Sequence, residues 1–145
     1  MGQNTLSRET IEHLCETAVE MRQMSYVPYS HFRVGAALLT EEGKIFTGCN
    51  IENAAFTPTN CAERTAFFKA VSEGYYRFAA IAISGGPEDG ELQYCPPCGV
   101  CRQVMAEFCD PESFRIILAK DAENCRTYTL AELLPLSFGK IQLES

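Results

Sequence analysis

Apolar residues between Leu6 and Met24 recur with the spacing of one helix face. They stand at Ile11, Leu14, Cys15, Ala18, Val19 and Met21, as an amphipathic helix requires. Ser7, which is followed by acidic residues, is a suitable start because a serine side chain can accept a hydrogen bond from an early backbone N–H. We expect the helix to end before Tyr26–Tyr29, because Pro28 disfavours helical conformation in the residue before it.

A hairpin and a second helix are predicted next. Phe32–Thr40 has the composition of a strand, Glu42-Gly43 that of a turn, and Lys44–Cys49 that of the hairpin partner. Asn60–Val71, rich in alanine and aromatic residues, is predicted to be helical, with Gly74 as its stop.

Two later segments are nearly continuous apolar runs, Phe78–Ser84 and Phe114–Ala119. Such runs predict strands that are covered on both faces. The polar, glycine-rich stretch Gly85–Gln93 between them is predicted to be a loop. A short fifth strand is expected near Arg126–Tyr128.

Helical spacing returns in Gly99–Phe108, and the letters LAELL near the C-terminus predict a helical turn. Helices that alternate with apolar strands indicate an α/β fold. We therefore predict a three-layer α/β/α architecture with a mixed, mostly buried five-stranded sheet. Without a repeat or linker, residues 1–145 are predicted to form a single domain.

Composition and charge exclude some classes of partner. No apolar run approaches the about 20 residues of a membrane span, so we expect no membrane partner. The formal net charge is −7, and no two of the 12 Lys and Arg residues are adjacent. Nucleic-acid backbones are bound by clustered cations, so we expect no nucleic-acid partner. The N-terminus lacks the layout of a secretion signal, which predicts a cytoplasmic location.

The chain contains eight cysteines, which in a chain of this length without a secretion signal are expected to be reduced thiols or metal ligands rather than disulfides. Four of them stand singly among core-like neighbours and are predicted to pack as small apolar residues: Cys15, Cys49, Cys109 and Cys125. Cys98 and Cys101, spaced i, i+3 at a helix start, can reach one metal ion. Zinc needs three or four ligands, so a further ligand must be Cys95 or a distant cysteine. Cys61 is the best distant candidate, because it also precedes a predicted helix.

Glu63 follows Cys61 by two positions, a spacing that does not bring side chains together on a regular helix. The pair can share a site if Cys61 lies in the opening turn. A carboxylate would then stand beside the metal without binding it. Three protein ligands leave one position for water, which is the arrangement of a catalytic zinc site.

Cys61-Ala62-Glu63 and the later Pro97-Cys98-Gly99-Val100-Cys101 resemble the two-part signature of zinc-dependent nucleoside and nucleobase deaminases. The chain is most similar to the small, homotetrameric cytidine deaminases, and the similarity runs nearly end to end. Further matching segments are Val27-Pro28-Tyr29-Ser30, Phe32, Val34-Gly35-Ala36-Ala37, Gly48-Cys49-Asn50-Ile51-Glu52-Asn53-Ala54 and Leu133-Leu134-Pro135.

This resemblance implies a cytidine deaminase-like fold, one Zn²⁺ per subunit and a homotetramer that acts on a small nucleoside. It implies hydrolysis of cytidine and 2′-deoxycytidine to uridine and 2′-deoxyuridine, a reaction of pyrimidine salvage. It assigns zinc binding to Cys61, Cys98 and Cys101, and proton transfer to Glu63. It further assigns the ribose hydroxyls to Asn50 and Glu52, the pyrimidine ring to Phe32, and a backbone contact with the base to Ala62. The aromatic residues Tyr29, Phe56 and Phe138 correspond to positions that help to close a neighbouring subunit's site, although core packing also explains them.

The charge of the expected site points to one more residue. Three thiolates leave a zinc ion at a net charge of −1, and Arg64 is the candidate to donate hydrogen bonds to them. Arg102 is the reserve candidate.

Three alternatives remain open from the sequence. The enzyme could act on another aminopyrimidine, but a free base has no ribose for Asn50 and Glu52. A closed, non-catalytic zinc module would need a fourth ligand, for which Cys95 is available, and leaves Glu63 without a role. Cys95 and Cys98 could instead form a redox dithiol, which requires Cys98 to be free of metal.

Overall fold

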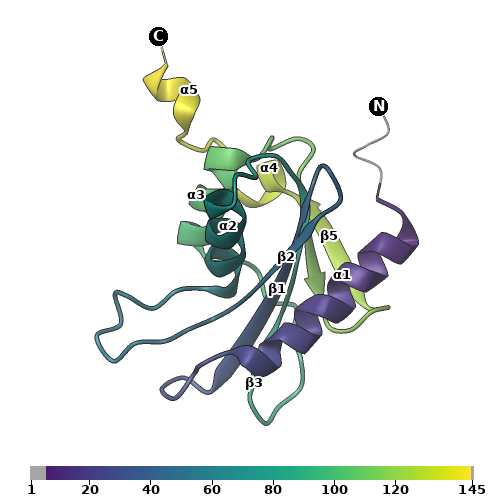
Figure 1. Cartoon of the computed structure of the whole chain (residues 1–145), viewed down its shortest axis with the longest axis vertical. Coiled ribbons are helices and arrows are strands. Elements are labelled where there is room, and N and C mark those ends of the chain that lie inside the picture. The colour runs from purple at the N-terminus through teal and green to yellow at the C-terminus, as the bar shows by residue number, and fades with distance from the viewer. Residues whose placement is uncertain (1–5, 145) are drawn as a thin grey trace.

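A computed structural model describes residues 6–144. Its centre is a five-stranded mixed sheet in the order β2-β1-β3-β4-β5 (Figure 1). Only the β3–β4 pair is parallel among the described pairs. The strands are β1 (Phe32–Thr40), β2 (Ile45–Cys49), β3 (Phe78–Pro87), β4 (Arg115–Ala119) and β5 (Cys125–Thr129).

Helices cover both faces of this sheet, which confirms the predicted three layers (Figure 1). Helix α1 (Arg8–Met21), with Ser7 as its cap, packs on one face and continues into the short 3-10 helix η1 (Arg22–Met24). Helices α2 (Ala62–Ser72) and α3 (Gly99–Phe108) pack on the other. The chain ends with two short helices, α4 (Leu130–Leu133) and α5 (Lys140–Leu143).

Alternation along the strands divides the core into two layers. Ala36 and Leu38 of β1 face α2 and α3, whereas Ala37 faces α1. The α1 side is lined by small residues of β3, such as Ala80 and Ala82, so this helix can lie close to the sheet. The opposite side holds larger side chains. Among them is an aromatic cluster between the helices and the sheet, which consists of Phe67, Phe78, Phe108 and Phe114.

Gly48 fixes how closely α2 approaches the sheet. A Cβ atom at this position of β2 would lie 2.3 Å from the carbonyl oxygen of Ala62 and 2.7 Å from the backbone nitrogen of Ala66. No real side chain tolerates such distances to backbone atoms. The first turn of α2, which carries the candidate metal site, therefore rests directly on the strand.

One boundary prediction was wrong. The sequence predicts a loop at Gly85, Gly86 and Pro87, but these residues extend β3 and pair with Val34, Arg33 and Phe32 of β1. Glycine and proline are typical of loops, and pairing with a distant strand overrides that preference here. Helix α5 was not predicted.

No helix within residues 6–144 is long and apolar enough to cross a membrane.

Candidate metal and substrate site

The starts of α2 and α3 bring three cysteine sulfurs together. Cys61 caps α2 and Cys98 caps α3, each with extended backbone and without a side-chain capping bond. The Sγ atoms of Cys61 and Cys98 lie 3.7 Å apart, and those of Cys98 and Cys101 lie 3.4 Å apart. All three lie within 4.8 Å of one another.

These distances fit a zinc ion. Three sulfurs at the usual 2.3 Å from a tetrahedral zinc stand about 3.8 Å from one another. The two helix N-termini add partial positive charge, which favours the thiolate form that metals bind. Cys101 is buried and Cys98 is exposed, so one side of the cluster is open. The cluster is therefore able to hold a metal ion, with Cys61, Cys98 and Cys101 as its ligands.

Arg64 lies one helical turn from Cys61 and points at it. Its Nη2 atom donates a hydrogen bond to the Cys61 sulfur at 3.3 Å. A hydrogen bond from Cys101 and this contact with Arg64 lower the pKa of the Cys61 thiol to about 5, while burial acts in the opposite direction. A cation thus stands beside the sulfurs, as the charge of three thiolates requires.

Arg102, the reserve candidate for this contact, lies in a different set of hydrogen bonds. Its Nε atom donates to the carbonyl of Pro97 at 2.7 Å, and its Nη1 atom donates to that of Leu133 at 2.6 Å. Arg102 therefore anchors the segment that leads into Cys98, because it ties that segment to the end of α4.

Glu63 is buried in the first turn of α2, with a side chain that is 4% exposed. Burial raises the pKa of its carboxyl to about 7; its own backbone N–H opposes this effect, and the Cys61 thiolate adds to it. Cys61 precedes the helix with extended backbone. Cys61 thus lies directly before the first turn of α2, and Glu63 lies within that turn.

Cys95 is not part of the cluster that the described residues form. Its pKa is raised to about 11, chiefly by burial and further by Glu63 and Cys61. Its sulfur instead fills the space above Gly85, where a Cβ atom would lie 2.8 Å from Cys95 Sγ and 3.3 Å from Phe32 Cε2. Cys95 and Phe32 therefore pack against the same glycine.

Asn50 and Glu52 lie in extended chain, because Ile51 between them bridges to Tyr26 and Asn60. The Asn50 amide is bound to β1: Oδ1 accepts from Val34 N at 2.9 Å, and Nδ2 donates to Phe32 O at 2.8 Å. A second N–H and a second lone pair on this amide can still bind a ligand.

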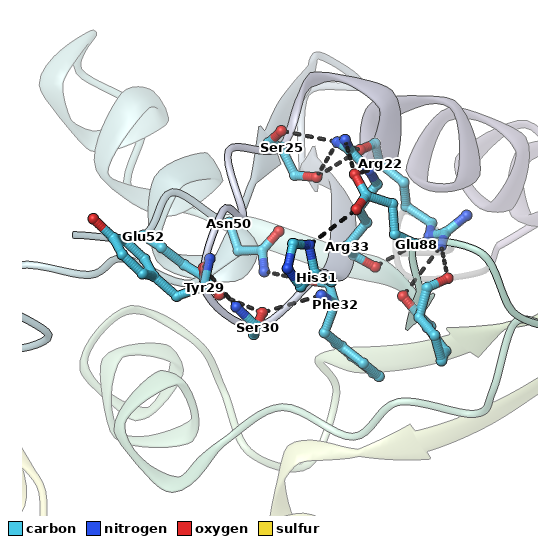
Figure 2. A network of polar contacts seen from close by, with 12 residues as sticks. Arg22, Ser25, Tyr29, Ser30, His31, Phe32, Arg33, Asn50, Glu52 and Glu88 are labelled. Atoms are coloured by element: carbon cyan, nitrogen blue, oxygen red, sulfur yellow. Dashed lines mark hydrogen bonds and ion pairs between the residues drawn. The ribbon is translucent and has the colours of Figure 1, made fainter. Parts of the chain in front are cut away.

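Glu52 closes the turn before β1 (Figure 2). Its Oε1 atom accepts hydrogen bonds from the backbone N–H groups of Tyr29 and Ser30 at 3.0 and 3.1 Å, and its Oε2 atom accepts one from the Ser30 hydroxyl. Desolvation opposes ionisation, but these hydrogen bonds lower the pKa of the Glu52 carboxyl. The turn before β1 thus favours the ionised form of Glu52 and holds both of its carboxylate oxygens.

A cavity of about 390 Å³ adjoins Glu52 and is lined by Tyr29, Ser30, Glu52, Asn53, Phe56 and Thr59. The rings of Tyr29 and Phe56 meet edge to face, with centroids 6.5 Å apart. Their side chains are 50% and 72% exposed, so core packing, the alternative that the sequence left open, does not describe them.

Phe138 lies elsewhere, between α4 and the projecting α5 (Figure 1). Its side chain is 59% exposed, and its carbonyl accepts a hydrogen bond from Gln103 Nε2 of α3 at 2.8 Å. It does not line the cavity beside Glu52. The structure of one chain thus brings Tyr29 and Phe56 together with Glu52, but not Phe138.

Comparison with known proteins identifies the family. Residues 8–116 match the model of the cytidine and deoxycytidylate deaminase zinc-binding region. The chain belongs to this family. It is 50% identical to the cytidine deaminase of Sporosarcina psychrophila over 92% of this chain and 94% of that protein. It is 32% identical to the blasticidin-S deaminase of Bacillus cereus, over 93% and 96%.

Solved structures of the family have the same fold. The crystal structure of the cytidine deaminase from Burkholderia pseudomallei superimposes with a TM-score of 0.77 at 45% identity, and the match covers 87% of this chain and 97% of that one. The fold and family that the sequence predicted are therefore confirmed.

The sequence did not point to several residues that support the site. Ser30 binds the backbone N–H of Phe32, Glu88 binds Arg33 next to it, and Arg22 binds the carbonyls of Arg33 and Gly86 in the adjoining strands (Figure 2). Ser30 could have been found in the Pro-Tyr-Ser segment that precedes β1. Glu88 carried no signal, because its partner Arg33 is 55 residues away in the sequence.

Proposed function

We propose that the protein is a zinc-dependent deaminase that hydrolyses cytidine and 2′-deoxycytidine to uridine and 2′-deoxyuridine and releases ammonia. The observation that carries this proposal is the three-sulfur cluster of Cys61, Cys98 and Cys101 with the buried carboxyl of Glu63 next to it in the chain. The similarity to cytidine deaminases, up to 50% identity among the relatives above, supports the substrate.

When bound to these sulfurs, zinc supplies a Lewis acid that lowers the pKa of a water molecule toward neutrality. Glu63 takes a proton from the attacking water as the new C–O bond forms at C4 of the pyrimidine. It delivers this proton to N3, then takes the remaining proton from the new C4 hydroxyl and delivers it to the amino group as the C4–N bond breaks, so that cytidine and water become uridine and ammonia. The burial of Glu63 keeps bulk water away from these protons.

The remaining candidates bind the nucleoside. Phe32 packs against the pyrimidine ring, and the backbone N–H of Ala62 holds the base. Asn50 and Glu52 bind the ribose hydroxyls, since an amide both donates and accepts while a carboxylate accepts from a hydroxyl. The ionised state of Glu52, favoured by Ser30 and Tyr29, suits this role.

The assembly that we propose is a homotetramer. Tyr29 and Phe56 are large aromatic side chains exposed beside the substrate cavity, and Phe138 is exposed near the end of the chain. Exposed aromatic residues of this kind are typical of interfaces, and in a tetramer they help to close a neighbouring subunit's site. We place the reaction in the cytoplasm, because cysteines that serve as metal ligands are typical of a reducing compartment.

A closed zinc module is a less suitable alternative. It needs a fourth protein ligand, and Cys95 lies over Gly85 rather than in the sulfur cluster of the described residues. A deaminase of another aminopyrimidine is the nearer alternative, because one relative is a blasticidin-S deaminase at 32% identity.

The experiment that tests the proposal measures ammonia release and zinc content in one sample. Purified protein is given cytidine, 2′-deoxycytidine, cytosine or blasticidin S, and is assayed before and after treatment with a chelator. We expect one zinc per chain, release of ammonia from both nucleosides but not from cytosine, and loss of activity with the metal. No ammonia from cytidine, or ammonia that does not depend on metal, would contradict the proposal.

A further inference from the structure

Phe32, the residue proposed to contact the pyrimidine, stands between two residues that one carboxylate holds. Glu88 lies just beyond β3. Its Oε2 atom accepts hydrogen bonds from Arg33 Nε at 3.0 Å and from Arg33 Nη2, while its Oε1 atom lies 3.2 Å from His31 Nδ1. The backbone N–H of Glu88 also donates to the His31 carbonyl at 2.6 Å.

Alternation along β1 puts the side chains of Phe32 and Arg33 on opposite sides of the strand. The Phe32 side chain packs with the core layer that contains Cys61 and Cys95. Figure 2 shows its ring pointing away from the Arg33 guanidinium. Glu88 therefore contacts the two residues that flank Phe32 rather than Phe32 itself, and none of these contacts involves Cys61 or Cys98.

The Arg33 guanidinium also binds Ser25, the residue that directly follows η1. Its Nη1 atom donates to the carbonyl and the hydroxyl oxygen of Ser25, at 2.9 Å each. Arg22 is 9% exposed. Its guanidinium donates hydrogen bonds to the carbonyls of Arg33, Gly86 and Pro87 at 3.1 to 3.3 Å. Arg33 forms an ion pair only with Glu88 among the described residues.

The same backbone carries the contacts to the ribose candidates. Ser30 Oγ accepts a hydrogen bond from Phe32 N at 3.0 Å and donates one to Glu52. Asn50 binds Phe32 O and Val34 N. A shift of residues 31–33 would therefore move Phe32 and also loosen the partners of Asn50 and Glu52.

We propose that Glu88 is a positioning residue for nucleoside binding, which acts through Arg33 and His31 on the backbone around Phe32. This inference rests on the proposed function. Glu88 prepares the pocket before the substrate arrives and touches none of the groups proposed for the proton transfers. Its removal is therefore expected to weaken binding and to leave the chemical step nearly intact.

The test compares Glu88→Ala, the isosteric Glu88→Gln and Arg33→Gln with the parent protein. We expect KM for cytidine to rise about tenfold in Glu88→Ala with kcat changed by no more than about twofold, because the lost interaction contributes equally to binding of the substrate and of the transition state. The inhibition constant of uridine should rise in parallel, and zinc content should stay at the parent value. The double variant Glu88→Ala with Arg33→Gln should be no worse than the poorer single variant, because the two residues act as one pair.

Asp89→Ala is the matched control, since Asp89 is the next acidic residue and forms no ion pair within residues 6–144. It should keep the parent KM. A lower melting temperature in the Glu88 variants with unchanged KM and uridine inhibition would overturn the positioning role. If Glu88→Ala does not fold, the test rests on Glu88→Gln. We then expect a smaller rise in the KM for cytidine, and a KM equal to that of the parent protein would contradict the inference. A parent protein that releases no ammonia from cytidine would contradict the proposed function instead.

Discussion

The guanidinium of Arg64 donates a hydrogen bond to the sulfur of Cys61, with Nη2 and Sγ 3.3 Å apart. The two residues are one turn apart at the start of α2, so the contact is set by the local helix. It places a permanent cation against a cluster whose three thiolates would otherwise leave a bound zinc ion with a net negative charge. Substitution of Arg64 therefore tests whether this positive charge is needed at the site.

Replacing Arg64 by Gln should lower kcat/KM for cytidine about 10- to 100-fold, the usual effect of removing a hydrogen bond to a metal ligand. Zinc should remain largely bound, because the three sulfurs are unchanged. Steady-state kinetics with zinc analysis measure both quantities, and Lys69→Gln on the same helix is the control. Normal turnover in Arg64→Gln would reject the role of this residue.

Replacing Glu63 by Ala should lower turnover by about 100- to 10,000-fold, because the protons lose the group that transfers them. The fold and the zinc content should be retained, since Glu63 is not among the three ligands. Circular dichroism, zinc analysis and ammonia release on the same preparation measure this. Glu73→Ala at the end of α2 is the control. Activity close to that of the parent would favour a purely structural metal.

Replacing Cys98 by Ser should reduce zinc to less than about a tenth of one ion per chain after dialysis, because two sulfurs cannot complete the site. Cys95→Ser should keep its zinc, since Cys95 packs over Gly85 outside the cluster of the described residues. Metal analysis of the two variants side by side makes the comparison. Loss of zinc from Cys95→Ser would make Cys95 a ligand and the site a closed one.

Replacing Gly48 by Ala should destabilise the fold by about 3 kcal/mol, because the new methyl group would meet the backbone of α2 at 2.3 Å. Zinc affinity should fall as well, since the displaced turn carries Cys61. Chemical denaturation of the metal-loaded protein measures the change. Gly139→Ala, where no atom lies within 4 Å of the new Cβ, should match the parent, and equal stability of both variants would contradict the close approach.

Much of this molecule could be predicted from the sequence because its signals are local. The strand Phe32–Thr40 and the helix Gly99–Phe108 were predicted with the bounds that they have. The spacing of Cys98 and Cys101 at a helix start indicated a metal site before any distance was known. In each case, neighbours within a few residues decide the outcome.

What the sequence could not reveal depends on distant pairing. Gly85–Pro87 has the composition of a loop, and only its register with Phe32–Val34 makes it part of β3. Glu88 and Arg33 are 55 residues apart in the sequence, and only the register of β3 with β1 brings them into contact. Arg102 was a reasonable reserve for the thiolates by position, yet the carbonyls of Pro97 and Leu133 take its hydrogen bonds.

X-ray absorption at the zinc edge of the purified protein counts the atoms around the ion. Three sulfurs near 2.3 Å and one oxygen near 2.0 Å, the values usual for such ligands, are expected from Cys61, Cys98, Cys101 and a water molecule. A shell of four sulfurs, or of fewer than three, would contradict an open site built on two helix starts.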